Sequence, residues 1–260
     1  MVEKRSQRLF VLNKQKDSIV AERSYLCSTG KVSGNKKRSG DLKTPEGIYF
    51  LNEKIDSSAL PPKYGAGAYV LDYPNGFDQI IKRKGYGIWI HGTNEPERLE
   101  KSMDTRGCVI VKDEDFIDLA QYVELYKTPV VIVDEVQYRN IEYVNRDKKE
   151  TMEFLENWKV SWQSKSLENY IKLYSKDFRR KKMNIQSYRS YKKRLFRKYD
   201  WIKLRLSNIQ IFRNPQYIVI NFIQEYSADT YSDFGVKQLF LIKENNSFRI
   251  IKENWTEIQN

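Results

Sequence analysis

Seven short apolar runs within residues 8–134 constrain the fold of the first half of this chain more than any other feature. Each run has four to six residues, and most are rich in β-branched or aromatic types. Runs of this length are typical of strands and too short for helices. The predicted strands cover residues 8–12, 18–22, 47–51, 68–72, 87–91, 108–111 and 129–134.

One helical segment interrupts these strands. Apolar residues recur at helical spacing from Phe116 to Val123, and Asp113 is placed to cap the start of that helix. We therefore expect residues 1–138 to form a mostly-β domain with one main helix.

The pattern changes in the second half of the chain. The spacing of Leu155, Trp158 and Trp162 predicts a helix, and two more are predicted over 167–178 and 188–199. Helices followed by antiparallel strands predict an α+β domain over residues 150–260, with the helices packed on one face of a curved sheet. The predicted strands cover residues 201–212, 216–227, 236–244 and 247–255, and the charged stretch 135–150 is predicted to connect the two domains.

The two halves also differ in charge. The net charge is +12, with 25 basic and 23 acidic residues in 1–150 but 21 and 11 in 151–260. The basic second half favours an anionic partner. No apolar run approaches the roughly 18 residues that a membrane helix needs. The N-terminal residues lack the apolar core of a signal peptide, so we expect any leader to have been removed.

His91, the only histidine, and Cys108, one of two cysteines, stand 17 positions apart, each beside a glycine. A single histidine excludes a His-rich metal site. An imidazole can activate a thiol as a nucleophile, and His91 ends one predicted strand while Cys108 starts another. Adjacent strand ends would bring the two together. A buried structural cysteine and a histidine that caps a strand are the alternative.

Backbone groups beside this pair complete a hypothetical catalytic site. The Gly92 carbonyl can orient the imidazole, in place of the usual Asp or Asn. The N–H groups of Gly107 and Cys108 can face a developing oxyanion, and Gly107 lets the backbone approach a substrate closely. The second thiol, Cys27, is predicted to be a buried strand residue.

The motifs around this pair, "IHGTN" (90–94) and "TRGCVIV" (105–111), resemble the signature of the YkuD-type L,D-transpeptidase catalytic domain. Upstream, "STGKVSGNKKRSGDLKTPEGIY" (28–49) is similar to the Ser-Thr-Gly-Lys and Thr-Pro-x-Gly stretch of that family. The segment "YGAGAYVLDYPNGFD" (64–78) resembles the one that precedes the histidine in its carboxypeptidase-like branch. The resemblance covers about residues 5–135. It implies a β-sandwich catalytic domain that needs no metal or cofactor.

The same resemblance implies residues for substrate binding. Arg106 stands where many members have a second histidine, and Ile110 where they have an arginine. The guanidinium of Arg106 suits a substrate carboxylate, and a solvated loop arginine is the alternative. Thr105, Tyr69 and Ala68 are the other positions that the resemblance implies for substrate binding.

The family acts on peptidoglycan stem peptides, which implies a periplasmic location. Cys108 would attack the amide between the L-centre of diaminopimelate and the following D-alanine, with His91 as base and acid. Water as acceptor gives an L,D-carboxypeptidase, which converts tetrapeptide to tripeptide. An amine acceptor gives an L,D-transpeptidase instead. The non-enzyme alternative is a scaffold that binds peptidoglycan or another polyanion.

Residues 150–260 resemble the NTF2-like fold, a cone of helices over a curved antiparallel sheet. The two domains in this order resemble the cell-shape-determining L,D-carboxypeptidases of curved Gram-negative bacteria, which favours the carboxypeptidase and a role in cell shape. The second domain has neither His nor Cys, so we interpret it as a binding or positioning module. Asp229 and Asp233 are interpreted as turn formers.

A basic run over residues 176–198 holds eleven Lys and Arg and one acidic residue, with Tyr188 and Tyr191 among them. The run raises nucleic-acid binding as a hypothesis from another class. We favour the solvated face of a helix whose tyrosines point inward, and therefore muropeptides rather than nucleic acid as the partner.

Overall fold

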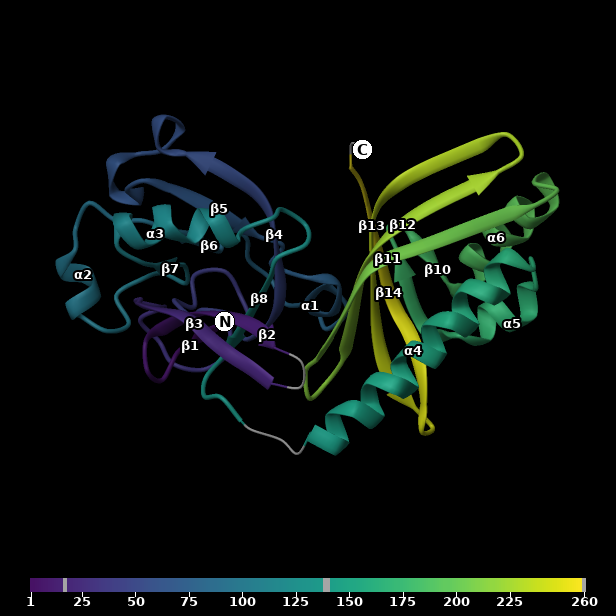
Figure 1. Cartoon of the computed structure of the whole chain (residues 1–260), viewed down its shortest axis with the longest axis horizontal. Helices are drawn as coiled ribbons and strands as arrows, with labels where there is room; N and C mark the ends of the chain where they lie inside the picture. The colour runs from purple at the N-terminus through teal and green to yellow at the C-terminus, as the bar shows by residue number, and fades with distance from the viewer. Residues whose placement is uncertain (16–17, 138–140, 259–260) are drawn as a thin grey trace. The chain divides into compact units, whose positions relative to one another are not determined.

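The computed structural model describes residues 1–15, 18–137 and 141–258. The chain divides into two compact units, residues 1–138 and 139–260 (Figure 1). The first is mostly β with one main helix, and the second is α+β, so the fold class expected of each half is confirmed.

The described residues of unit 1 form eight strands in one sheet, in the order β3-β2-β1-β8-β4-β5-β6-β7. The strands are β1 (Val2–Glu3), β2 (Arg8–Gln15), β3 (Ser18–Leu26), β4 (Gly47–Asp56), β5 (Gly67–Leu71), β6 (Trp89–His91), β7 (Val109–Ile110) and β8 (Pro129–Val133). Every strand predicted in this half is present, with shifted ends.

Strand β4 joins the two halves of this sheet. Its first residues, Gly47–Phe50, pair with β8, and the rest of the strand pairs with β5. A register shift between Leu51 and Glu53 marks the change of partner. Such a bulge bends a strand, so one continuous strand serves both the β3-β2-β1-β8 half and the β5-β6-β7 half.

Short helices accompany the sheet of unit 1. They are η1 (Ser57–Ala59), η2 (Pro62–Tyr64), α1 (Gly76–Ile80), α2 (Glu97–Glu100), α3 (Asp113–Leu119) and η3 (Ala120–Tyr122). α3 buries Phe116 and Leu119 in the core of the unit, on the face that the sequence predicted. The prediction for Asp113 was wrong, because it is the first residue of α3 and its side chain does not cap the helix. Its carboxylate binds two loops instead.

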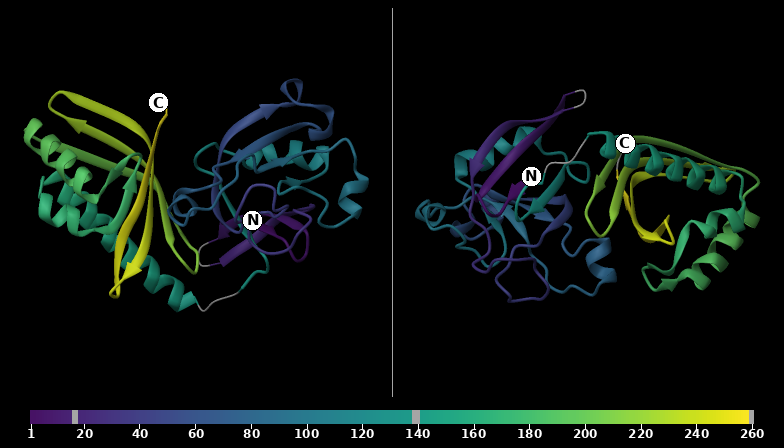
Figure 2. Two further views of the ribbon diagram at one scale, coloured as in Figure 1. Left: turned by 180° about the vertical axis from the view of Figure 1, so that it is seen from behind. Right: turned by 90° about the horizontal axis from the view of Figure 1, so that it is seen from below.

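The described residues of unit 2 form three helices and a six-stranded sheet in the order β10-β9-β14-β13-β12-β11. Figure 2 shows this sheet curling around the side that the helices cover. The elements are α4 (Ile141–Gln163), α5 (Leu167–Lys172), β9 (Tyr174–Arg180), β10 (Met183–Asn184), α6 (Ile185–Lys198), β11 (Ile202–Arg213), β12 (Ile218–Ala228), β13 (Tyr231–Glu244) and β14 (Ser247–Glu257).

The predicted helix over 167–178 is wrong in its second half. α5 ends at Lys172, and Tyr174 and Phe178 lie on β9, which pairs in parallel with β14. Residues four apart share a face in a helix and also in a strand, so their spacing could not separate the two. Both rings are buried in the core, as either structure would require.

Two further expectations in this half need correction. α4 begins at Ile141, so the second part of the charged stretch 135–150 is helical, while residues 138–140 lie outside the described residues. Asp233 is not in a turn but on β13, where its side chain is half-buried. Asp229 does lie in the β12–β13 turn, and it accepts a hydrogen bond from the Asp200 N–H.

Candidate active site

The strands that carry His91 and Cys108 are neighbours in the sheet of unit 1. β6 ends at His91, β7 begins one residue after Cys108, and the two pair in parallel with His91 opposite Ile110. Because the two strands are parallel, the end of β6 does not meet the start of β7, contrary to the prediction from the sequence. His91 and Cys108 instead lie diagonally across the two strands. One further step of this register puts Cys108 opposite Trp89, on the same face as His91. The two side chains therefore lie on one face of the sheet, on neighbouring strands and two residues apart in register.

The imidazole of His91 is held in one tautomer. Its Nδ1 lies 2.6 Å from the Gly92 carbonyl oxygen. A carbonyl only accepts hydrogen bonds, so Nδ1 carries the proton and Nε2 keeps its lone pair. The Tyr64 ring packs edge-on against the imidazole, with 4.9 Å between ring centroids. Burial lowers the pKa of His91 to about 4, against the effect of the Gly92 hydrogen bond, so the ring is neutral at pH 7.

The thiol of Cys108 is also neutral at that pH. The residue is partly exposed, and Sγ lies 3.4 Å from the Gly87 carbonyl oxygen. Burial of the sulfur raises the pKa of the Cys108 thiol, against a hydrogen bond from the Trp89 backbone and the charges of Lys36 and Arg98. The pair is therefore a thiol and a neutral imidazole, and the thiol must lose its proton as it attacks. An imidazole with a free lone pair is a group that can take it.

Two threonines hold the turn before the cysteine. The Thr105 hydroxyl accepts from the Gly107 N–H at 3.0 Å and donates to the Cys108 carbonyl at 2.7 Å. The Thr44 hydroxyl donates to the Gly107 carbonyl at 3.0 Å. The predicted oxyanion donor Gly107 N–H is thus already used within the turn. Among the described residues the Cys108 N–H has no acceptor, so it is the member of the predicted pair that can face an oxyanion.

The glycine at this turn makes room for the chain itself. Gly107 has φ +130°, and a Cβ there would lie 2.8 Å from the Lys43 carbonyl oxygen. Gly30 forms a bridge with Thr105, and its N–H donates to the Thr44 hydroxyl at 2.8 Å. Residues of the motif over 28–49 therefore pack against the cysteine turn and hydrogen-bond to it.

Lys36 is a site residue that sequence reasoning missed. Its Nζ lies 2.6 Å from Asp41 Oδ1, and both side chains are almost fully buried. Asp41 also accepts from the N–H groups of Lys37, Arg38 and Lys43, and these bonds hold the pKa of its carboxyl well below the usual range although burial opposes them. The pair fixes a cation whose charge reaches the Cys108 sulfur. The sequence feature that could have indicated this pair is a run of basic residues followed by Gly-Asp.

The predicted substrate-binding residues divide into three kinds. The Arg106 side chain is exposed on the loop before the cysteine. The Thr105 hydroxyl is committed to the turn. Ala68 pairs with His91 across β5 and β6, whereas the Tyr69 ring is buried against Phe116. The Tyr69 side chain therefore packs in the core and cannot present its ring to a substrate, which corrects that expectation.

The described residues contain no group of three or more His, Cys, Asp or Glu side chains that could hold a metal ion. Nor does that part of the chain have a helix long and apolar enough to cross a membrane. Cys27 is completely buried, as predicted, but it lies one residue beyond the end of β3 and not on the strand. Burial raises the pKa of its thiol to about 12.

Unit 2 buries a second polar cluster, centred on Glu253 of β14. The carboxylate lies 3.1 Å from Arg180 Nε and accepts from the hydroxyls of Tyr174 at 3.2 Å and Tyr188 at 2.8 Å. Burial opposes its charge, yet the cations of Lys237, Lys192 and Arg180 hold the pKa of Glu253 below the usual range. A buried carboxylate with these partners is fully satisfied.

Two lysines of this cluster lack a close carboxylate partner. Lys192 and Lys237 are each 3% exposed, and neither has a carboxylate within 4 Å among the described residues. The Lys192 Nζ lies 3.3 Å from the centroid of the Trp162 ring, and the Nε1 of that ring has no hydrogen-bond partner within the part of the chain that the structure describes. Burial lowers the pKa of both lysines. The basic run is therefore not a uniformly solvated face, since Lys192 points inward with Tyr188.

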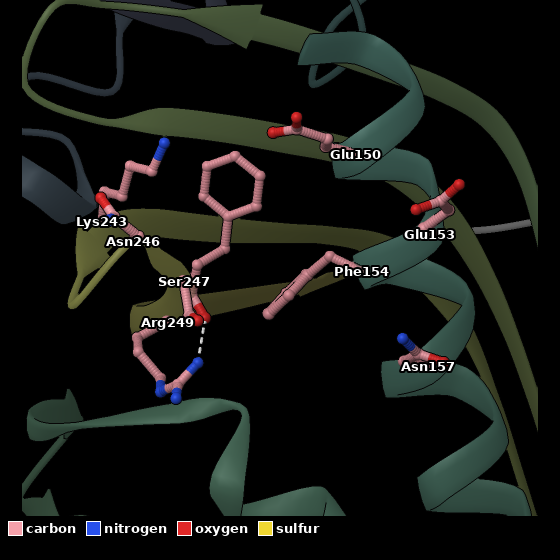
Figure 3. Close-up of a pocket in the computed structure, with 9 residues that line it drawn as sticks. Glu150, Glu153, Phe154, Asn157, Lys243, Asn246, Ser247 and Arg249 are labelled. Atoms are coloured by element: carbon pink, nitrogen blue, oxygen red, sulfur yellow. Dashed lines mark hydrogen bonds between the residues drawn. The ribbon is translucent and has the colours of Figure 1, made fainter. Parts of the chain in front are cut away.

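A separate open hollow of about 300 Å³ also belongs to unit 2 (Figure 3). α4 lines it with acidic side chains, and the β13–β14 hairpin lines it with basic ones. The residues are Glu150, Glu153, Phe154, Asn157, Lys243, Asn246, Ser247, Phe248 and Arg249. No thiol or imidazole lies there, so the reactive pair of unit 1 is the better candidate for catalysis.

Comparisons with known proteins match both units. Residues 1–132 match the L,D-transpeptidase catalytic domain, YkuD, and residues 150–254 match the Cds6 C-terminal NTF2-like domain. Bd1075 of Bdellovibrio bacteriovorus is 32% identical, with a TM-score of 0.80 over 100% of this chain and 92% of that one. The helical cell shape determining protein Pgp2 of Campylobacter jejuni is 27% identical, with a TM-score of 0.74 over 97% of this chain and 90% of that one. Curated protein sequences gave no match.

Proposed function

Because the chain belongs to the L,D-transpeptidase catalytic domain family, we propose that it is a peptidoglycan L,D-carboxypeptidase. Its substrate is the stem tetrapeptide of the cell wall, and its products are the tripeptide and free D-alanine. This substrate gives the protein an extracytoplasmic, periplasmic place of action.

The observation that carries this proposal is the 2.6 Å contact from His91 Nδ1 to the Gly92 carbonyl. It leaves Nε2 with a lone pair, and the strand register places the neutral thiol of Cys108 on the same face of the sheet. Nε2 takes the thiol proton while Cys108 Sγ bonds to the carbonyl carbon of the amide. The carbonyl oxygen becomes an oxyanion, which the Cys108 N–H can stabilise.

The reaction then closes in two steps. The C–N bond breaks, Nε2 returns its proton to the departing D-alanine amine, and a thioester to Cys108 remains. Water next attacks the thioester while Nε2 takes its proton, and the sulfur leaves to recover that proton as a thiol. The tripeptide gains a carboxylate, and the enzyme returns to its starting state.

Hydrolysis rather than cross-linking is supported by the likeness to a protein described as a determinant of helical cell shape. That likeness covers both units in the same order. Trimming tetrapeptides removes the groups from which cross-links are built, and so links this chemistry to wall shape. An L,D-transpeptidase, with an amine in place of water, is the alternative for the same thioester.

The second unit serves this enzyme as a binding module for the anionic substrate. Arg180 and two lysines whose pKa burial lowers, Lys192 and Lys237, face two carboxylates in its interior, Glu253 and the half-buried Asp233. A ligand carboxylate bound beside the two lysines would favour their charged form and give them a partner. In a Cys108→Ala background, Lys237→Met should weaken tetrapeptide binding at least tenfold by calorimetry, whereas exposed Lys203→Met should leave it unchanged.

The test of the activity is product analysis with defined disaccharide peptides. Wild-type protein and Cys108→Ala are incubated with tetrapeptide and with pentapeptide, and products are read by mass spectrometry. Loss of one D-alanine from tetrapeptide, only with Cys108 present, supports the carboxypeptidase. Cross-linked dimers would replace it with the transpeptidase, and unchanged substrates in reducing buffer would contradict both.

A further inference from the structure

Asp113 lies on the same segment as the candidate nucleophile. It is the first residue of α3, five positions after Cys108 and directly beyond β7. A helix begins here without a side-chain cap, so the carboxylate is free of the role that aspartates often have at this position. Its bonds go to two other loops of unit 1.

One oxygen of this carboxylate binds both loops beside His91. Asp113 Oδ1 accepts from the Thr93 N–H at 2.9 Å and from the Ala66 N–H, also at 2.9 Å. Thr93 follows Gly92, whose carbonyl binds the imidazole. Ala66 lies two residues after Tyr64, whose ring packs on the imidazole. The two contacts that orient His91 are thus both tied to Asp113.

The glycines of the two loops make this arrangement possible. A Cβ on Gly65 would lie 1.9 Å from Asp113 Oδ1, and a Cβ on Gly92 would lie 2.1 Å from it. Gly65 also has φ +58°, which other residues rarely adopt. Glycine therefore stands at the two positions where the Asp113 carboxylate lies too close to the backbone for a side chain.

We propose that Asp113 is a positioning residue that fixes His91 relative to Cys108, by tying the Gly92 and Tyr64 loops to the segment that carries the cysteine. This role goes beyond the Cys-His-Gly group and rests on the proposed function. Asp113 touches neither reacting atom, so it acts through the Gly92 carbonyl and the Tyr64 ring. Misplacement of a catalytic group by about 1 Å can cost about 10²-fold in rate.

Two substitutions separate position from charge. In Asp113→Asn the amide oxygen can still accept hydrogen bonds from both N–H groups, whereas Asp113→Ala removes both hydrogen bonds. We expect Asp113→Asn to keep kcat within about threefold and Asp113→Ala to lower kcat about 10²-fold with KM within about twofold. Glu114→Ala, exposed and one residue further on α3, is the matched control and should match wild type.

The single histidine supplies a readout that does not depend on turnover. NMR titration of the only imidazole reports the pKa of His91 directly. In Asp113→Ala the ring should open to water, and its pKa should rise from about 4 toward 6.5. In Asp113→Asn the ring stays buried and loses a nearby negative charge, while Arg98 and Lys63 still face it, so its pKa should stay low or fall.

The outcomes distinguish this proposal from the proposed function. Wild-type kcat and an unchanged His91 titration in Asp113→Ala would overturn the positioning role. Equal losses in Asp113→Asn and Asp113→Ala would also overturn it, because charge would then matter and position would not. If Asp113→Ala does not fold, Gly65→Ala disturbs the same contact and should shift the His91 titration upward. A shifted titration in a protein without activity on stem peptides would uphold the positioning role and reject the function.

Discussion

The reactive pair of unit 1 and the Glu253 cluster of unit 2 are built on opposite principles. In unit 1 the reactive pair is neutral, and its hydrogen-bond partners are backbone groups fixed by strands and turns. In unit 2 the cluster around Glu253 is built from ionisable side chains: Arg180 pairs with the carboxylate, and Lys192 and Lys237 lower the pKa of Glu253 while burial lowers their own. The first site depends on position, whereas the second depends on charge. This difference matches the roles that we propose for the two units, chemistry in the first and recognition of an anion in the second.

The largest expected effect tests whether the pair in unit 1 is neutral. Because burial raises the pKa of the Cys108 thiol, its alkylation by iodoacetamide should rise about tenfold per pH unit from pH 6 to 9, or about 10³-fold in all. Labelling is followed by mass spectrometry. Buried Cys27 is the internal control and should stay unlabelled until urea is added. A rate that levels off below pH 8 would indicate a thiolate–imidazolium pair instead.

The next effect tests the charges of unit 2. Glu253→Ala leaves Arg180 and its neighbours without their carboxylate, and should lower the free energy of unfolding by about 3–5 kcal/mol in urea titrations. Glu257→Ala, exposed on the same strand, should change it by less than about 0.5 kcal/mol.

Lys192→Met sharpens that comparison within the cluster. Since this lysine lacks a carboxylate within 4 Å among the described residues, replacing it should cost nothing or stabilise the fold by about 1 kcal/mol. A loss as large as that of Glu253→Ala would mean that the cluster is balanced without a ligand.

An intermediate effect links the pKa of His91 to stability. The folded protein holds this pKa at about 4, below the 6.5 of an unburied imidazole. The unfolded chain therefore binds a proton first, so this contribution to stability is complete above pH 6.5 and is lost as the pH falls toward 4. The loss should reach about 3 kcal/mol. Urea unfolding at pH 7 and pH 4.5 gives the change in the free energy of unfolding between the two pH values. His91→Gln should lack the part of this change that comes from the imidazole. An equal change in wild type and His91→Gln would mean that the imidazole is exposed to water.

The smallest effect concerns the exposed loop of unit 1. If Arg106 holds a substrate carboxylate, Arg106→Ala should raise KM about tenfold and leave kcat within about twofold. Lys101→Ala, exposed on the same loop, is the control. Steady-state kinetics on tetrapeptide decide the matter, and unchanged values would make Arg106 a solvated loop residue.

Family, fold class and strand positions of unit 1 were predictable because short apolar runs and reactive motifs are local features. The matches to the YkuD and NTF2-like families confirm the resemblances drawn from residues 28–49, 90–94 and 105–111 and from the second half. The spacing of Tyr174 and Phe178 failed because it fits a helix and a strand alike.

The polar partners were not predictable, because they come from distant loops. Asp113 looks like a helix cap in the sequence, and only the fold brings it to Ala66 and Thr93. The Gly107 N–H looks free until Thr105 is seen to accept from it. Lys192 looks like one more solvated lysine until its neighbour Trp162 is known.

The parallel pairing of β6 and β7 makes the enzyme open to engineering. Hydrogen bonds between the strands set the spacing of His91 and Cys108. The two ends of the intervening segment 92–107 hold the pair in place through Gly92, Thr93 and Thr105, whereas its middle makes none of these contacts. The tip of that loop, residues 94–97, is exposed. A peptide tag or a recognition loop inserted there should be tolerated with the reactive pair intact, so this tip offers a place to give the enzyme a new target without redesigning its chemistry.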